Sequence, residues 1–197
     1  MFSPKVYFFT LGVIVLFTAC KKKDATVQPV LQPPMQYIDL HDATVQFGRY
    51  ISLDLDKDKA TDIVFGTQLV GDPIEKVDKA QWLVSSSFYT SLLINDREEL
   101  PLLQLQDSIP VGNLPMYNWY NAGSIVLVQK IQTLIGNAHW DGVWKQANHH
   151  YVAFQLNKQD HIINGWIEVS FDPAKEHLIL HKAGVSQEKN RTIMAGK

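Results

Sequence analysis

The chain has 197 residues, of which 46% are hydrophobic and 19% are charged, and its formal net charge at pH 7 is −2. This balance is typical of a globular protein, and a chain so close to neutrality lacks the basic surface that nucleic-acid binding requires, so we expect no nucleic-acid partner. About 160 residues follow the N-terminal segments described next, which is enough for one domain with its own hydrophobic core.

Residues 1–19 have the composition of a signal peptide. Lys5 supplies a short basic start, and the apolar run over residues 6–19 is shorter than the roughly 20 residues that a bilayer-spanning helix needs. The run ends in LFTAC, so small residues precede Cys20, the single cysteine of the chain. This ending resembles the lipobox of bacterial lipoproteins, with Phe17 where leucine is more common. The resemblance implies that Cys20 becomes the acylated first residue; an ordinary secretory signal or an anchor helix is the alternative.

Residues 20–36 are predicted to be a tether behind that cysteine. The segment is charged at its start and then rich in proline and glutamine, a composition typical of linkers. Its KKKD start resembles the charged stretch of surface-exposed lipoproteins of the Bacteroidetes. Removing residues 1–19 takes away the charge of Lys5 and changes the net charge from −2 to −3. We therefore expect an outer-membrane lipoprotein, held to the membrane by its lipid and facing either the periplasm or the cell surface.

Residues 37–197 are predicted to form an all-β domain, a single β-sandwich or a barrel-like structure. The clearest pattern lies in residues 166–171, where Ile167, Val169 and Phe171 alternate with Trp166, Glu168 and Ser170. That period of two is typical of a strand with one buried face. Further strands are expected over residues 35–40, 44–53, 63–70, 82–94, 124–134, 151–156 and 177–182.

Two segments are predicted to interrupt the strands. Residues 74–80 have the pattern of one or two helical turns, with Asp72 as a weak N-terminal cap. Residues 110–120 resemble a loop. The run over residues 124–134 fits a buried strand or a short helix, and its isoleucines and valines favour the strand.

The segment ISLDLDKDKATDIVF, residues 51–65, contains the strongest candidate site. Its aspartates, at positions one, three, five and nine of a short loop between two strands, are Asp54, Asp56, Asp58 and Asp62. Alternate residues of a curled loop point inward, so these carboxylates can converge on one hard cation. Without a cation, four negative charges would crowd together at a cost. The spacing therefore predicts a structural Ca²⁺ site.

The loop is not an EF-hand, because Lys59 replaces the usual glycine at position six and Phe65 replaces the bidentate glutamate at position twelve. It is similar instead to the calcium loops of FG-GAP and related β-rich repeats, whose pattern is DxDGDGxxD followed by apolar residues. Lys57 and Lys59 stand where that pattern has small residues. The alternative is a solvated acidic hairpin whose own lysines neutralise part of the charge.

A second resemblance covers most of residues 38–197. After the acidic loop come HHYVAFQL, NGWIEVSF, HLILHKAGV and a terminal TIMAG. This order is similar to a broad group of secreted or lipid-anchored Bacteroidetes proteins without an assigned activity. The matching positions are the acidic loop, Gly165–Trp166 and Ala195–Gly196. The resemblance implies a β-rich domain outside the cytoplasm.

The aromatic residues Tyr117, Trp119 and Tyr120 are a candidate ligand-binding group. They lie beside asparagines, and aromatic rings with neighbouring amides can stack on sugars and bond their hydroxyls. The same residues can instead fill a β-sheet core. Trp140 and Trp144 present the same alternative, whereas Trp166 is expected to pack in the core.

Histidine and carboxylate chemistry has less support in the sequence. His149 and His150 are adjacent and so face opposite sides of a strand, which disfavours a shared metal ion. No G-x-S-x-G, H-E-x-x-H or phosphate-binding glycine loop is present. We expect a binding or scaffold module for a glycan or protein ligand, without assigned catalytic residues. The alternative is a glycan-active hydrolase using paired carboxylates, with Asp141, Asp160 and Glu168 as candidates.

Overall fold

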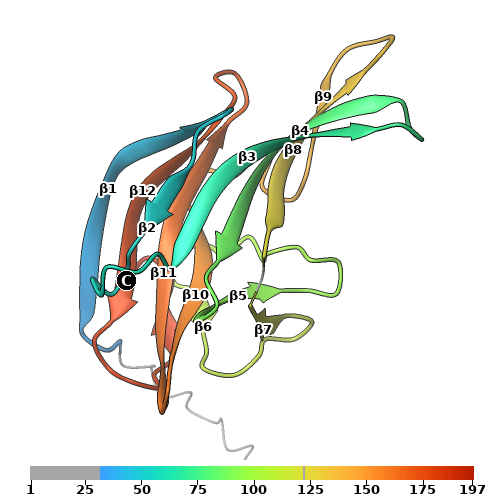
Figure 1. Cartoon of the computed structure of the whole chain (residues 1–197). Helices are drawn as coiled ribbons and strands as arrows, with labels where there is room; N and C mark the ends of the chain where they lie inside the picture. The colour runs from blue at the N-terminus through green and yellow to red at the C-terminus, as the bar shows by residue number, and fades with distance from the viewer. Residues whose placement is uncertain (1–31, 122) are drawn as a thin grey trace, which may run out of the picture.

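The computed structural model describes residues 32–121 and 123–197, so the predictions for residues 1–19 and Cys20 lie outside it. Within this part the chain forms antiparallel sheets and no helix, which confirms the all-β prediction (Figure 1). The strands are β1 (Met35–Gln46), β2 (Ile51–Leu53), β3 (Ile63–Asp72), β4 (Val77–Ser86), β5 (Thr90–Ile94), β6 (Ser108–Ile109), β7 (Asn118–Tyr120), β8 (Ile125–Thr133), β9 (His139–Asp141), β10 (His150–Lys158), β11 (His161–Asp172), β12 (His177–Ser186) and β13 (Ile193–Met194).

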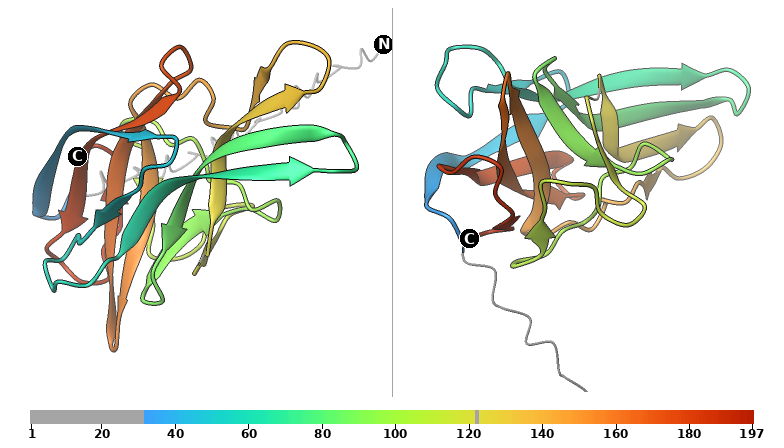
Figure 2. Two further views of the ribbon diagram at one scale, coloured as in Figure 1. Left: turned by 45° about the horizontal axis from the view of Figure 1, so that its top comes forward. Right: turned by 90° about the horizontal axis from the view of Figure 1, so that it is seen from below.

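Two larger sheets form the body of the domain. The first has the strand order β1-β12-β11-β10-β5-β7 and the second has the order β2-β3-β4-β8-β9. Neither sheet closes on itself, so the domain is sandwich-like and not a closed barrel. The distal part of the β3–β4 hairpin and the β8–β9 connection extend beyond the body (Figures 1 and 2).

The main core fills the space between these two sheets. On β11 it includes Ile167, Val169 and Phe171, the apolar set that the period of two predicts. Trp82 contributes from β4, and its indole N–H donates to the Val45 carbonyl at 3.1 Å. Burial of these side chains from water is the main force that holds the two sheets together.

A second apolar cluster covers part of the opposite face of the first sheet, which we call the outer face. Trp166 is fully buried there, as predicted, and packs edge-on against Tyr151 with ring centroids 5.4 Å apart. Ile109 and Ile193, from the small β6–β13 sheet, complete this cover. Strand β11 is therefore covered on both faces around Trp166. Its polar residues Glu168 and Ser170 lie on the same face as Trp166.

The prediction of helical turns over residues 74–80 is wrong. Asp72 accepts hydrogen bonds from the amides of Ile74 and Glu75 at 3.0 and 2.9 Å, but it caps the β3–β4 hairpin turn. Lys76 then has a φ of 55°, which ends the turn, and β4 begins at the next residue. Ten residue pairs between β3 and β4 outweigh the weak local preference for a helix.

Candidate functional site

The acidic loop joins β2 to β3, as its flanking apolar residues predict. The Asp62 amide donates to the Leu53 carbonyl at 2.8 Å and so closes the base of the loop. Leu55, between the first two aspartates, is 1% exposed and belongs to the main core. The loop is therefore fastened to the domain at its base and by one buried side chain.

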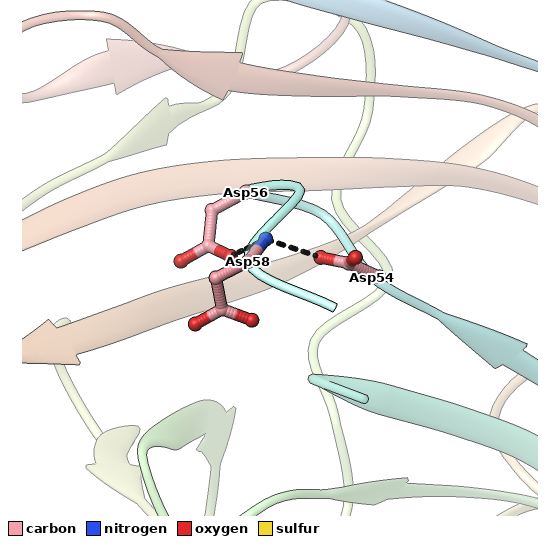
Figure 3. A group of neighbouring side chains, drawn as sticks. All are labelled: Asp54, Asp56 and Asp58. Carbon is pink, nitrogen blue, oxygen red and sulfur yellow. Dashed lines mark hydrogen bonds between the residues drawn. The ribbon is translucent and has the colours of Figure 1, made fainter. Parts of the chain in front are cut away.

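Three of the four expected ligands gather in this loop. Asp54, Asp56 and Asp58 each offer a carboxylate oxygen, and these three atoms lie within 4.8 Å of one another. In Figure 3 the side chains of Asp56 and Asp58 extend side by side. Asp54 lies on the other side of the Asp58 amide nitrogen. Such a group can bind a metal ion, because clustered carboxylate oxygens are ligands for hard cations.

Backbone amides hold these carboxylates in place. The Asp58 amide lies 3.2 Å from Oδ1 of both Asp54 and Asp56, and the Lys59 amide donates to Asp54 Oδ2 at 2.9 Å. The Ala60 amide donates to Asp58 Oδ1 at 2.8 Å, and this bond is the largest cause that lowers the pKa of Asp58. Each carboxylate oxygen has two lone pairs, so these bonds leave acceptor capacity for a cation.

The two lysines within the loop adopt the backbone conformation that glycine adopts most easily. Lys57 has a φ of 64° and Lys59 a φ of 74°, both in the left-handed region. These are the positions at which the similar calcium loops have glycine. The left-handed conformation disfavours residues with a Cβ but does not forbid them. The lysines therefore do not prevent the loop from curling as the glycine-containing pattern would.

Asp62 lies outside the group of three and braces the loop. It is 5% exposed, and its Oδ2 accepts a hydrogen bond from the Leu55 amide at 2.7 Å. Burial raises the pKa of Asp62, and the negative charges of Asp56 and Asp58 raise it further. The hydrogen bond from Leu55 and the positive charge of Lys158 act in the opposite direction and lower this pKa.

A distant lysine supplies positive charge to the loop. The Lys158 ammonium, at the end of β10, forms an ion pair with Asp56 and lies 3.5 Å from Asp58 Oδ2. Its hydrogen bond to Asp56 is the largest cause that raises the pKa of Lys158. The sequence predicted that Lys57 and Lys59 could neutralise the loop, but the lysine that forms these ion pairs comes from another hairpin. Lys158 therefore competes with any cation for the carboxylates of Asp56 and Asp58.

A second polar group lies on the outer face, beyond the apolar cover, and we call it the outer-face cluster. Its members are Asp42, His149, Glu168, Ser170, His181 and Lys182. His181 Nδ1 lies 2.6 Å from Asp42 Oδ1, and His181 Nε2 lies 2.8 Å from Ser170 Oγ. The His149 ring stacks on the His181 ring with centroids 4.3 Å apart, and its Nδ1 lies 2.7 Å from Glu168 Oε1. Lys182 Nζ is 3.5 Å from Glu168 Oε2.

Irregular backbone brings this cluster together. The β1–β12 register shifts between Asp39 and Ala43, so the intervening residues bulge out of the ladder. Asp42 and His149 have left-handed φ values of 51° and 53°. The ladder between β11 and β12 also shifts beside Glu168, opposite His181. Bulges re-aim side chains in this way and are common beside functional sites.

The three candidate ligand-binding aromatics do not share one face. Tyr117 and Trp119 are half-buried against the outer-face apolar cluster, and the Trp119 indole N–H donates to the Gly112 carbonyl at 3.0 Å. Tyr120, the next residue on β7, is 61% exposed. Adjacent strand residues point to opposite faces, which separates Tyr120 from Trp119. Of the three, Tyr120 presents the most open ring to a ligand.

The other residues singled out from the sequence have separate partners. Trp144 is buried in the main core, and Trp140 packs against that core. The three candidate catalytic carboxylates lie on different elements: Asp141 on β9 accepts from Gln129, Asp160 pairs with His161 in the β10–β11 turn, and Glu168 on β11 pairs with His149. Each of these carboxylates therefore has a polar partner of its own.

Sequence reasoning missed Lys158, Asp42, Ser170 and His181. Their spacing along the chain gives no signal, because each reaches its partner through strand pairing between distant segments.

Within residues 32–121 and 123–197, no helix is long and apolar enough to cross a membrane. Comparisons of the chain with family models, curated proteins and solved structures find no match.

Proposed function

We propose that the protein is a lipid-anchored outer-membrane domain, outside the cytoplasm, that holds Ca²⁺ structurally and serves as a binding or scaffold module. The metal proposal rests on one observation: Asp54, Asp56 and Asp58 each offer a carboxylate oxygen, and these three oxygens lie within 4.8 Å of one another. The anchor rests on the sequence alone, on the lipobox-like segment before Cys20. We propose that the exposed surface of the domain binds a glycan or a protein.

The donor set fits calcium better than a transition metal. Every candidate ligand is a carboxylate oxygen, and Ca²⁺ takes six to eight oxygens in flexible geometries that carbonyls and water can complete. A bound ion would add positive charge beside Asp62, whose charged form burial disfavours. It would also fix the tip of the connection between β2 and β3, which the aspartate hydrogen bonds and the Lys158 ion pairs hold in its absence. The ion's proposed task is therefore to rigidify this connection.

Calcium is expected to raise the melting temperature of the full chain, extracted in detergent, relative to the same sample in chelator. A free ion concentration about 100 times the dissociation constant stabilises by about 2.7 kcal/mol, which corresponds to roughly 5–10 °C for a domain of this size. Asp56→Ala should abolish the increase because it removes a central ligand. The tryptophan fluorescence melt measures both. Identical melts of the unmodified chain in calcium and chelator would refute the calcium site.

The anchor has its own test. Cys20→Ser is expected to leave the protein unacylated and to release it from the membrane fraction, because the thiol is the atom that lipidation would modify. Fractionation and the intact mass of the purified chain measure these outcomes. Lys5→Ser, which changes the basic start but not the cysteine, is a control for general damage to export. An unmodified mass at Cys20 in the membrane-bound chain would exclude the lipoprotein.

A further inference from the structure

We propose that Ser170, His181 and Asp42 form a nucleophilic serine centre that hydrolyses esters of small acyl groups. It lies on the outer face and shares no residue with the acidic loop. The three side chains come from β11, β12 and the bulge of β1, and two hydrogen bonds of 2.8 and 2.6 Å link them in series. The proposal thus adds an activity to the binding or scaffold role.

The hydrogen bonds have a definite direction. An ionised carboxylate can only accept, so His181 Nδ1 carries the proton that it donates to Asp42. In the neutral imidazole the other nitrogen, Nε2, is then the acceptor, and the Ser170 hydroxyl donates to it. The His149 amide donates to Ser170 Oγ at 2.8 Å, which completes the series. A serine that donates to such an imidazole has the arrangement that general-base activation of a hydroxyl requires.

The surroundings hold His181 in this orientation. The His181 side chain is mostly buried, whereas Asp42 remains largely exposed. The stacked His149 ring covers one face of the His181 ring. His149 is in turn bonded to Glu168, so its ring is fixed from the other side. An imidazole held on one face and at both nitrogens loses little orientational freedom when the reaction begins.

The reaction that this geometry supports is acyl transfer to water. Ser170 Oγ forms a bond to the ester carbonyl carbon while its proton passes to His181 Nε2. The bond from that carbon to the alcohol oxygen then breaks, and the departing oxygen takes the proton from His181. Water attacks the acyl-serine with His181 again as the base, which releases a carboxylic acid and restores the Ser170 hydroxyl. The His149 amide, which donates to Ser170 Oγ at 2.8 Å, holds the attacking oxygen in place.

The burial of the nucleophile sets the substrate class. Ser170 is 6% exposed, and its hydroxyl is in contact with His181 Nε2 and with the backbone amide of His149. Only a small, unbranched acyl group can bring its carbonyl carbon to such an oxygen. Acetyl esters are therefore expected to react faster than esters of branched acids, whereas the size of the alcohol, which points away from the sheet, matters less.

The test uses the full chain in detergent, a fluorophosphonate probe and p-nitrophenyl acetate. A single adduct is expected on Ser170 by intact mass and peptide mapping, and Ser170→Ala and His181→Gln should abolish it. Ser186→Ala is the matched control, because Ser186 is also a buried serine of this sheet but its hydroxyl bonds to the Glu188 carbonyl. This variant should label and hydrolyse as the unmodified chain does.

Asp42 acts through His181, so it is a positioning residue and needs a different readout. Because Asp42 is exposed, Asp42→Asn should fold, and it should lower the maximal rate of labelling by roughly tenfold or more without weakening the initial binding of the probe. No adduct on Ser170, or equal acetate hydrolysis by the unmodified chain and Ser170→Ala, would overturn the proposal. Neither result bears on calcium binding, which involves other residues.

Discussion

Lys158→Met is expected to lower the melting temperature of the calcium-free protein and to raise its affinity for calcium. The ammonium of Lys158 forms ion pairs with Asp56 and Asp58, so its removal leaves clustered carboxylates without their nearest cation. A unit charge about 4 Å from a divalent ion costs about 2 kcal/mol even in water, which corresponds to an increase in calcium affinity of roughly 30-fold when the charge is removed. Melts in chelator and a calcium titration measure the two effects.

Lys59→Gly is the matched control for this change. It removes another positive charge from the loop, but glycine adopts the left-handed φ of 74° at that position without strain. The melting temperature in chelator should therefore stay the same or rise, in contrast to Lys158→Met. If the two variants melt alike in chelator, Lys158 does not stabilise the metal-free loop. If Lys158→Met binds calcium no more tightly than the unmodified chain, Lys158 does not compete with the ion.

The pH dependence of this pairing has a definite sign. Hydrogen bonding, chiefly from Ala60, and the charge of Lys158 lower the pKa of Asp58 below its usual 3.8. A carboxylate whose pKa is lower in the folded state stabilises the fold above the unfolded-state pKa, and the stabilisation disappears as the pH falls through the folded-state pKa. The destabilisation caused by Lys158→Met should therefore be full at neutral pH and absent in strong acid.

Gly165→Ala is expected to destabilise the domain by about 3 kcal/mol, because it adds an atom to a core that has no space for one. A Cβ at Gly165 would lie 2.1 Å from Cζ of Phe154, its direct partner across the β10–β11 ladder. Phe154 is fully buried in the main core, so its ring cannot move aside without displacing its neighbours. The midpoint of denaturant unfolding measures the loss.

Gly112→Ala is the control for this substitution, since a Cβ there would meet no atom within 4 Å. It should leave the unfolding midpoint nearly unchanged or raise it slightly, because alanine restricts the unfolded chain. Gly184→Ala should behave like Gly165→Ala, as its Cβ would lie 2.5 Å from the Trp166 ring. An unchanged midpoint for Gly165→Ala would show that the Phe154 ring has another position available.

These two glycines explain the Gly-Trp motif in physical terms. Phe154 lies over Gly165 on the side of the main core, and Trp166 lies over Gly184 on the outer face. Each large ring occupies the space that the glycine opposite leaves free. The sequence shows the glycines and rings, but only the strand register determines which ring meets which glycine.

The sequence by itself determined the class of fold and the position of the acidic loop. Alternation in β10, β11 and β12 and the aspartate spacing are local patterns, and local patterns are sufficient where a single strand or turn decides the outcome. Residues 74–80 show where local patterns fail. Their weak helical pattern is overridden by the ten residue pairs that join β3 and β4.

Only the tertiary structure decided which charges and hydrogen bonds meet. Lys158 reaches Asp56 from another hairpin, and Asp42, Ser170 and His181 meet because three strands pair with bulges that turn their side chains to one face. The physical reason is that a shift of one residue in a strand register moves every side chain to the opposite face. Contacts across strands therefore depend on the whole sheet, whereas spacing along one segment fixes only the shape of that segment.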